Sequence, residues 1–297
     1  MRILFIGDIV GRPGRDLVRT GLDALVDRHD VDLVIANVEN AAAGFGITRE
    51  IGDQLLDAGV DVMTSGNHIW DKKEAIDYIG AEARLLRPAN YPPGVPGRGT
   101  YLARTADGCS VGVINIMGRV FMLNIDDPFT GVLREVDALR QRARIIFVDF
   151  HAEATSEKIA MGWHLDGKVT AVVGTHTHVQ TADERILPKG TAYLTDAGMT
   201  GPHDSIIGVE IEPALGRFLN ALPARFEPAT GNPRLNAVVV DADEKTGLAI
   251  GIERLSYSRD ELLALSSRPV TDPPSAMREG VWEPGLVPAT TKNERPV

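Results

Sequence analysis

The sequence predicts an α/β fold in which helices flank central β-sheets. Short apolar runs rich in β-branched residues alternate with longer segments whose apolar residues recur every three or four positions. This alternation is typical of a largely parallel sheet whose strands are connected by helices. The chain has 297 residues, 43% of them hydrophobic, so it can bury a full core. Polar clusters directly follow several apolar runs, and the ligands of such sheets gather at the carboxyl ends of strands.

The first third of the chain contains three predicted strands, each followed by a polar cluster. A loop over residues 9–14 is expected to lead into a helix over about residues 15–29, whose apolar residues share one face. Thr48 is a plausible N-cap for a second helix. The strands are expected at residues 2–7, 31–36 and 60–64.

The rest of the chain continues the alternation after a proline-rich loop at residues 87–99. A hairpin is predicted around Asp107-Gly108, formed by residues 101–103 and 111–116. Later strands are expected at residues 144–149, 170–174, 191–195, 235–241 and 248–255, helices at 132–142, 156–163 and 213–221, and a loop at 196–204.

We predict one domain over residues 1–265, followed by a tail. Residues 266–297 are rich in proline and have few periodic apolar positions, which is typical of a disordered segment. The chain has no internal repeat.

The composition limits the partners and the compartment. A formal net charge of −10 argues against binding a nucleic-acid polymer, which requires clustered Lys and Arg, but it allows a small phosphorylated substrate if a metal supplies positive charge. The single cysteine, Cys109, excludes an intrachain disulfide and fits a reducing compartment. The first apolar run is too short for a signal peptide, and no run approaches the length of a membrane span. We therefore expect a soluble cytoplasmic protein without membrane contact.

Two histidines with one residue between them follow the predicted strand at 170–174. In an extended segment, residues i and i+2 point to the same side, so His176 and His178 are expected to face one point. A lone histidine is usually a satisfied core residue, whereas a pair at the mouth of a strand is more often a pair of metal ligands.

Eight polar residues occupy the same position, just past a predicted strand, and they include four of the seven histidines. Histidine, carboxylate and amide ligands without a thiolate suit Mn, Fe, Zn or Co. They are too many for one tetrahedral ion, whereas two ions about 3.5–4 Å apart are a known device for phosphoryl displacement. The eight are Asp8, Glu39, Asn40, Asn67, His68, His151, His176 and His178.

The motifs that contain these residues resemble those of the calcineurin-like metallophosphoesterases. More closely, the chain resembles the YmdB-type group, which is similar to bacterial 2′,3′-cyclic-nucleotide phosphodiesterases. The resemblance covers about residues 1–255 and implies a calcineurin-like sandwich of central sheets flanked by helices. The motifs are Gly7-Asp8, Asn37-Val38-Glu39-Asn40, Gly66-Asn67-His68, His151 and Gly174-Thr175-His176-Thr177-His178.

The resemblance also implies roles for the residues. One metal would be held by Asp8, Glu39, Asn40 and His178. The other would be held by Glu39, Asn67, His151 and His176, with Glu39 bridging. His68 would be the acid beside the phosphate. The usual Asp-x-His is here Asp8-Ile9-Val10, so one histidine ligand is missing and Asn40 fills the vacancy. Fewer nitrogens favour a harder ion, so two Fe or Mn ions are expected, with Zn as an alternative.

The implied reaction is hydrolysis of a small cyclic phosphodiester. Hydroxide activated by the metals would attack phosphorus, and His68 would protonate the leaving oxygen. Asp71 is expected either to orient His68 or to cap the next helix. Two alternative functions stay open at this stage: a phosphomonoesterase or protein phosphatase with the same site, and a non-catalytic metal-binding regulator. Assembly as a homo-oligomer stays open as well.

Overall fold

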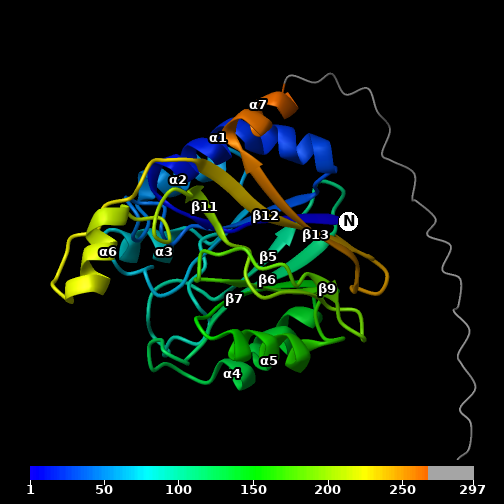
Figure 1. Ribbon diagram of the computed structural model, residues 1–297. Coiled ribbons are helices and arrows are strands. Elements are labelled where there is room, and N and C mark those ends of the chain that lie inside the picture. Colours follow the sequence, from blue (N-terminus) through cyan, green and yellow to red (C-terminus); the bar gives the residue numbers. More distant parts are fainter. Residues whose placement is uncertain (267–297) are drawn as a thin grey trace, which may run out of the picture. The chain divides into compact units, whose positions relative to one another are not determined.

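Two β-sheets pack face to face between two layers of helices (Figure 1). The computed structural model describes residues 1–266. The predicted α/β sandwich, with central sheets flanked by helices, is confirmed.

The seven-stranded sheet contains the N-terminal strand and the last two strands of the chain. β1 pairs in parallel with β3 and antiparallel with β12, and β13 lies on the other side of β12. Its strands, in spatial order, are β2 (Asp8–Ile9), β11 (Met199–Pro202), β12 (Pro233–Ala242), β1 (Arg2–Ile6), β3 (Leu33–Asn37) and β4 (Val62–Thr64), with β13 (Ala249–Ser258) paired to β12.

The six-stranded sheet is formed by the middle of the chain. The predicted hairpin is present as an antiparallel pair, and the next strands follow in parallel. In spatial order the strands are β5 (Thr100–Arg104), β6 (Ser110–Met117), β7 (Ile145–His151), β8 (Ala171–Thr175), β10 (Ala192–Leu194) and β9 (Arg185–Ile186).

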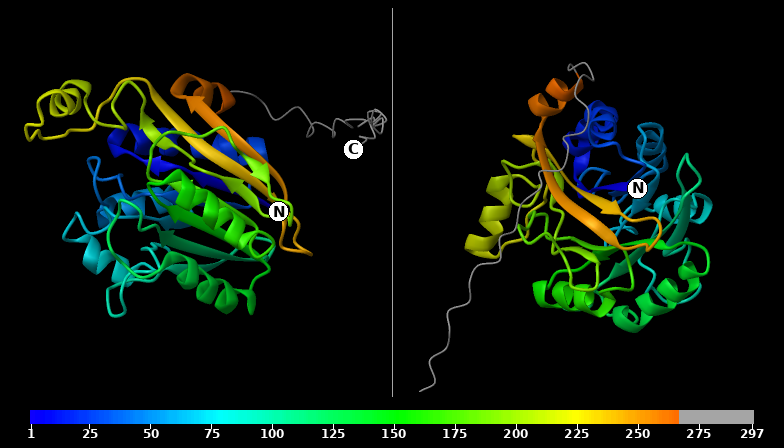
Figure 2. Two further views of the ribbon diagram at one scale, coloured as in Figure 1. Left: turned by 60° about the horizontal axis from the view of Figure 1, so that its bottom comes forward. Right: turned by 90° about the vertical axis from the view of Figure 1, so that its right-hand side faces the viewer.

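The helices cover the outer faces of both sheets. In the views of Figure 2, α1 (Gly11–His29) and α7 (Arg259–Ser266) lie on one side and α4 (Pro128–Arg140) and α5 (Thr155–Leu165) on the other. α2 (Arg49–Asp57) and α3 (Ala75–Ala81) belong to the first side, since their apolar residues share a core with α1. α6 (Ile211–Asn220) lies at the left edge of Figure 1.

The alternation of side chains along β1 explains the layered core. Leu4 and Ile6 face the helices α1 and α2, whereas Ile3 and Phe5 face the second sheet. Phe5 meets Phe147 of β7 with ring centroids 5.0 Å apart. The run Ile3–Ile6 is apolar at every position, as is typical of a strand that is buried on both faces. The two sheets are therefore held against each other by a continuous apolar layer.

Several boundaries differ from the prediction. α1 begins at Gly11, inside the predicted loop, because Gly14 lets the helix approach the carbonyl of Thr200 so closely that a side chain would not fit. The predicted loop at 196–204 contains β11, which pairs with the two-residue β2. The sheets are mixed rather than largely parallel, because β12 runs antiparallel to β1 and β13 antiparallel to β12.

Two further predictions concern membrane-spanning segments and the C-terminal tail. Residues 1–266 contain no helix with both the length and the apolar content that a membrane crossing needs. The tail predicted from residue 266 lies, from residue 267 on, outside the described residues.

Candidate metal centre

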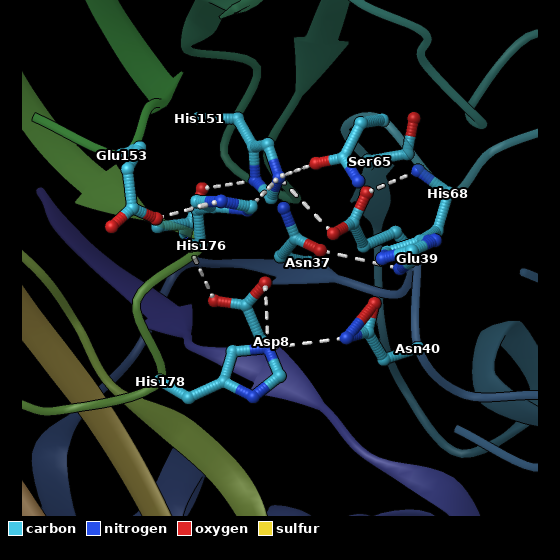
Figure 3. Close-up of polar contacts among 12 residues, drawn as sticks. Asp8, Asn37, Glu39, Asn40, Ser65, His68, His151, Glu153, His176 and His178 are labelled. Atoms are coloured by element: carbon cyan, nitrogen blue, oxygen red, sulfur yellow. Dashed lines mark hydrogen bonds and ion pairs between the residues drawn. The ribbon is translucent and has the colours of Figure 1, made fainter. Parts of the chain in front are cut away.

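The predicted ligands follow strands of both sheets and meet at one end of the sandwich (Figure 3). The seven-stranded sheet supplies oxygen atoms, from Asp8 in β2 and from the loops after β3 and β4. The six-stranded sheet supplies imidazole nitrogens, from the last residue of β7 and the loop after β8. The residues are Asp8, Glu39, Asn40 and Asn67 from the first sheet and His151, His176 and His178 from the second.

One group of candidate ligands surrounds Nε2 of His151. Oε1 of Glu39 lies 3.1 Å from this nitrogen, Nδ1 of His176 lies 3.1 Å from it, and Oδ1 of Asn67 lies 3.0 Å from it. A ring nitrogen carries at most one hydrogen, so it cannot satisfy all three atoms. Donor atoms of Glu39, His151 and His176 lie within 4.8 Å of one another, a spacing that suits ligands around one cation.

The hydrogen bonds behind His151 determine which ring nitrogen carries hydrogen. Oγ1 of Thr175 lies 2.9 Å from Nδ1 of His151 and donates its hydrogen to Oδ1 of Asp149, at 2.7 Å. The hydroxyl oxygen therefore accepts from Nδ1, and the neutral ring keeps its Nε2 lone pair for the centre of the group. Asp149 is held in turn by Thr64 and Asn37, which donate to its Oδ2.

A second group contains Asp8, Asn40 and His178. Nε2 of His178 lies 3.1 Å from Nδ2 of Asn40 and 3.8 Å from Oδ1 of Asp8. Nδ1 of His178 donates to the carbonyl of Ile207 at 2.7 Å. This hydrogen bond leaves the Nε2 lone pair directed at the carboxylate and the amide.

Three buried oxygens of these groups have no hydrogen-bond partner within the described residues: Oδ1 of Asp8, Oε1 of Glu39 and Oδ1 of Asn40. An unpaired buried acceptor costs about 1–3 kcal/mol, and more when it is charged. A cation between the lone pairs would remove this cost. Imidazole, carboxylate and amide donors suit Mn, Fe or Zn, so the residues fit such ions.

The charges of the first group also favour added positive charge. Burial lowers the pKa of His151, but the carboxylate of Glu39 outweighs burial and raises it to about 9. Burial opposes ionisation of Glu39, yet His151 lowers the pKa of that carboxyl to about 2. Burial, together with the neighbouring His151, lowers the pKa of His176 to about 3. Metals compete with protons for these atoms, so a group that attracts a proton this strongly also attracts a metal cation.

The prediction that His176 and His178 face one point is wrong. β8 ends at Thr175, and both histidines have positive φ values, 100° and 66°, so the backbone between them is not extended. His176 consequently joins the group around His151, whereas His178 joins Asp8 and Asn40. The bend is held by Asp196, whose Oδ2 accepts hydrogen bonds from the backbone N–H and the hydroxyl of Thr177.

His68 stands beside the first group without entering it. Its backbone N–H donates to Oε2 of Glu39 at 3.0 Å, and its side chain is 29% exposed. Nδ1 of His68 lies 2.7 Å from Oδ2 of Asp71. Asp71 therefore orients His68, and the other expectation for Asp71 is wrong because Glu74 is the N-cap of α3.

Sequence reasoning did not anticipate several residues that support the ligands. Asp149 precedes His151 by two positions in a buried strand. An acidic residue within an apolar run is unusual, and it could have identified Asp149 as part of the site from the sequence. Lys158 and Asp196, which form a buried pair under the His176–His178 bend, had no such signal. Glu153, in the loop after β7, lies with its Oε2 3.1 Å from Nε2 of His176.

The chain is similar in sequence to known proteins over most of its length. The sequence profile of the YmdB-like protein family matches residues 4–255. The 2′,3′-cyclic-nucleotide 2′-phosphodiesterase of Bacillus subtilis strain 168 is 51% identical over 263 residues, which cover 88% of this chain and 99% of that protein.

Solved structures show the same fold. A crystal structure of a hypothetical protein from Thermus thermophilus has a TM-score of 0.81 and 44% identity, covering 87% of this chain and 99% of that one. A crystal structure described as a novel phosphatase from Mycoplasma pneumoniae has a TM-score of 0.82 and 34% identity, covering 87% of this chain and 93% of that one.

Proposed function

Because the chain belongs to the YmdB-like protein family, we propose that it is a metal-dependent phosphodiesterase that hydrolyses 2′,3′-cyclic nucleotides. The observation that carries this proposal is the set of three buried oxygens without a hydrogen-bond partner within the described residues, from Asp8, Glu39 and Asn40, which lie beside imidazoles supplied by the other sheet. The chain matches nearly the whole length of the Bacillus subtilis relative, and the name of that relative supports the substrate class.

We assign two ions to the two groups. Asp8, Asn40 and His178 would hold one ion, and Asn67, His151 and His176 would hold the other. Glu39 would bridge, since its Oε1 already faces His151 and lacks a hydrogen bond. Mn or Fe fits this mixture of oxygen and nitrogen donors best, with Zn as the alternative.

When bound, ions of this kind neutralise charge on a phosphodiester and supply a nucleophile from water near neutral pH. The chain itself would contribute orientation. Thr175 and Ile207 fix the tautomers of His151 and His178 by accepting from their Nδ1 atoms. In the neutral form of each ring, the lone pair is therefore on Nε2, the atom that would face the ion.

His68 would supply the proton to the leaving sugar oxygen. The carboxylate of Asp71 accepts from Nδ1 of His68, so the transferable proton is the one on Nε2. The backbone of His68 is fixed through Glu39, whereas its ring remains partly exposed and accessible to a substrate. A residue anchored in this way can reach a bound phosphodiester without being a ligand itself.

The direct test combines metal analysis with a substrate panel. After reconstitution with manganese or iron, elemental analysis should approach two ions per chain, and 2′,3′-cyclic nucleotides should be hydrolysed only with metal present. Glu39→Gln should reduce both metal content and turnover. Glu50→Gln, which alters an exposed carboxylate in the first turn of α2, is the matched control and should change neither. A single ion at full occupancy, with Glu39→Gln fully active, would refute the dinuclear assignment.

A phosphomonoesterase is the second candidate, favoured by the description of the Mycoplasma pneumoniae structure as a phosphatase. The two functions share the metal chemistry, so the ligands do not separate them. Parallel assays with bis-p-nitrophenyl phosphate, p-nitrophenyl phosphate and cyclic nucleotides would distinguish the two functions. The proposal expects the diesters to be the better substrates.

A further inference from the structure

A cavity of about 570 Å³ has walls that adjoin the loops of the candidate ligands in sequence, and the proposed reaction does not use it. It lies between the first turn of α1, the loop that leads into α2, and a segment that begins at Pro228. Its size falls in the range of pockets that hold small ligands, about 300–1,000 Å³.

Three cationic side chains line this cavity: Arg12, Arg15 and Lys72. Within the described residues, the ammonium of Lys72 has no hydrogen bond or ion pair, although its side chain is partly buried. Arg15 is also partly buried, and its guanidinium donates to a backbone carbonyl, that of Ala41, rather than to a carboxylate. Cations held in this way, in a chain of net charge −10, indicate a site for an anion.

The nearby carboxylates leave most of this positive charge uncompensated. Arg12 pairs with Asp16 one turn along α1, with Nε and Oδ2 3.5 Å apart, but 83% of the Arg12 side chain is exposed. Such an exposed pair contributes little and can be exchanged for another anion at small cost. Glu50 lies in the first turn of α2 but is exposed.

Two helices begin at the wall of the cavity. α1 starts at Gly11, has no acidic residue in its first turn, and has no side-chain cap. α2 starts directly after Thr48, which lines the cavity. The N-terminus of a helix carries partial positive charge, so both helices add to the attraction of the three cations for an anion.

The walls of the cavity continue from the loops that carry the candidate ligands. Ala42 lies two residues after Asn40, so their Cα atoms are at most about 7 Å apart. Arg12 follows Asp8 by four residues, and Lys72 follows His68 by four. An anion in the cavity would therefore lie against the same chain segments that carry Asp8, Asn40 and His68, although none of these three side chains lines the cavity.

We propose that this cavity binds a second phosphate group of the substrate. The preferred substrates are then nucleotides that carry a phosphate besides the cyclic diester, such as a 5′-phosphorylated nucleoside 2′,3′-cyclic phosphate. This inference rests on the proposed function, because it concerns the same reaction. It extends that function by selecting a more highly charged substrate, which the three cations distinguish from the plain cyclic nucleotide.

The kinetic test compares kcat/KM for adenosine 2′,3′-cyclic phosphate with and without a 5′-phosphate. The protein should prefer the 5′-phosphorylated substrate, and Lys72→Met should lower the ratio of the two values about tenfold. Met keeps the unbranched stem that packs beside Gly46. Lys72→Arg should restore most of the ratio. Lys73→Met, which removes a charge from the exposed neighbour, is the matched control and should leave the ratio unchanged.

The binding test separates this inference from the proposed function. Inorganic phosphate is titrated calorimetrically into the full chain without added metal, where it can report the cavity alone. We expect phosphate to bind the unaltered protein, Lys72→Met to weaken this binding about tenfold, and Lys73→Met to leave it unchanged. This result supports the inference even if no cyclic nucleotide is hydrolysed. A ratio near one in the unaltered protein overturns the inference and leaves the phosphodiesterase proposal intact. Phosphate binding that is equal in both variants also overturns it.

Discussion

Nζ of Lys158 in α5 lies 2.5 Å from Oδ2 of Asp196, and both side chains are almost fully buried. Lys158 also donates to the carbonyl of Thr175, the last residue of β8, at 2.7 Å. Asp196 accepts from Thr177 on the other side. The ion pair thus joins the end of the strand to the bend that separates the candidate ligands His176 and His178.

The first prediction concerns this pair. Lys158→Met removes the cation and leaves Asp196 buried without its partner, so the free energy of unfolding should fall by about 3–5 kcal/mol. The bend that carries His176 and His178 should also loosen and lower metal content. Denaturant titration and elemental analysis measure the two effects.

Lys245→Met, in the exposed turn between β12 and β13, is the control for loss of a lysine and should change neither quantity. Unchanged stability and metal content in Lys158→Met would contradict the role given to the pair.

The second prediction concerns Gly66. A Cβ added here would overlap the imidazole of His151 and the carboxylate of Glu39. Gly66→Ala should therefore displace both side chains and reduce metal affinity about 10–100-fold, the loss typical when ligand orientation is disturbed. Calorimetric titration with manganese measures it.

Gly80→Ala in α3 makes the same change where an added Cβ meets no atom within 4 Å. That variant should keep normal metal affinity and gain about 0.5–1 kcal/mol of stability, because Ala is favoured over Gly in helices. Equal metal affinity in both variants would show that Gly66 is not sterically required.

The third prediction concerns His68 as an acid. His68→Ala should lower turnover of a cyclic nucleotide about 10²–10⁴-fold while both metals stay bound. Bis-p-nitrophenyl phosphate, whose leaving group needs little protonation, should be affected less. Asp71→Asn should also lower turnover of the cyclic nucleotide more than turnover of bis-p-nitrophenyl phosphate. Both losses should be smaller than those of His68→Ala, because Asp71→Asn disturbs only the orientation of His68. Full activity of His68→Ala on cyclic nucleotides would eliminate the acid role.

The fourth prediction concerns His29, the last residue of α1, which is not one of the candidate ligands. Burial lowers the pKa of His29, and its Nε2 lies 3.3 Å from the hydroxyl of Tyr257. The unfolded chain therefore takes up a proton near pH 6.5 while the folded chain does not, so acidification below that pH costs stability. His29→Gln should lose less stability than the unaltered protein when the pH is lowered from neutral to below that value.

The free energies of unfolding at the two pH values, from urea titration, give this difference. All other residues are the same in both proteins, so their contribution to the difference cancels. An identical pH dependence would mean that His29 is not protected from protonation in the folded state.

The order of strands and helices was largely predictable from sequence, whereas the short strands were not. β3 and β7 are long apolar runs buried on both faces, so their composition reveals them. β2 has two residues and β11 has four, and they form through pairing with distant parts of the chain: β2 with β11, and β11 also with β12. Such pairing depends on tertiary structure and leaves no local pattern.

The residues of the site were predictable as a set, but their division into two groups was not derivable from spacing. The i, i+2 rule assumes an extended backbone, and the positive φ of His176 and His178 breaks that assumption. The cause is Asp196, a residue that follows β10 and holds Thr177 from a distance in sequence. Similarly, the ring orientation of His151 depends on Thr175 and Asp149, which only the folded sheet brings together.

The division of donor types between the sheets has a consequence for assembly. Each proposed ion would take oxygen atoms from the seven-stranded sheet and nitrogen atoms from the six-stranded sheet. A chain with only one sheet formed would present either hard oxygen ligands or imidazoles alone, and would select the wrong metals. Discrimination among metals is then a property of the docked pair of sheets. The ions would act as cross-links between them, so partial unfolding of either sheet would release both metals together.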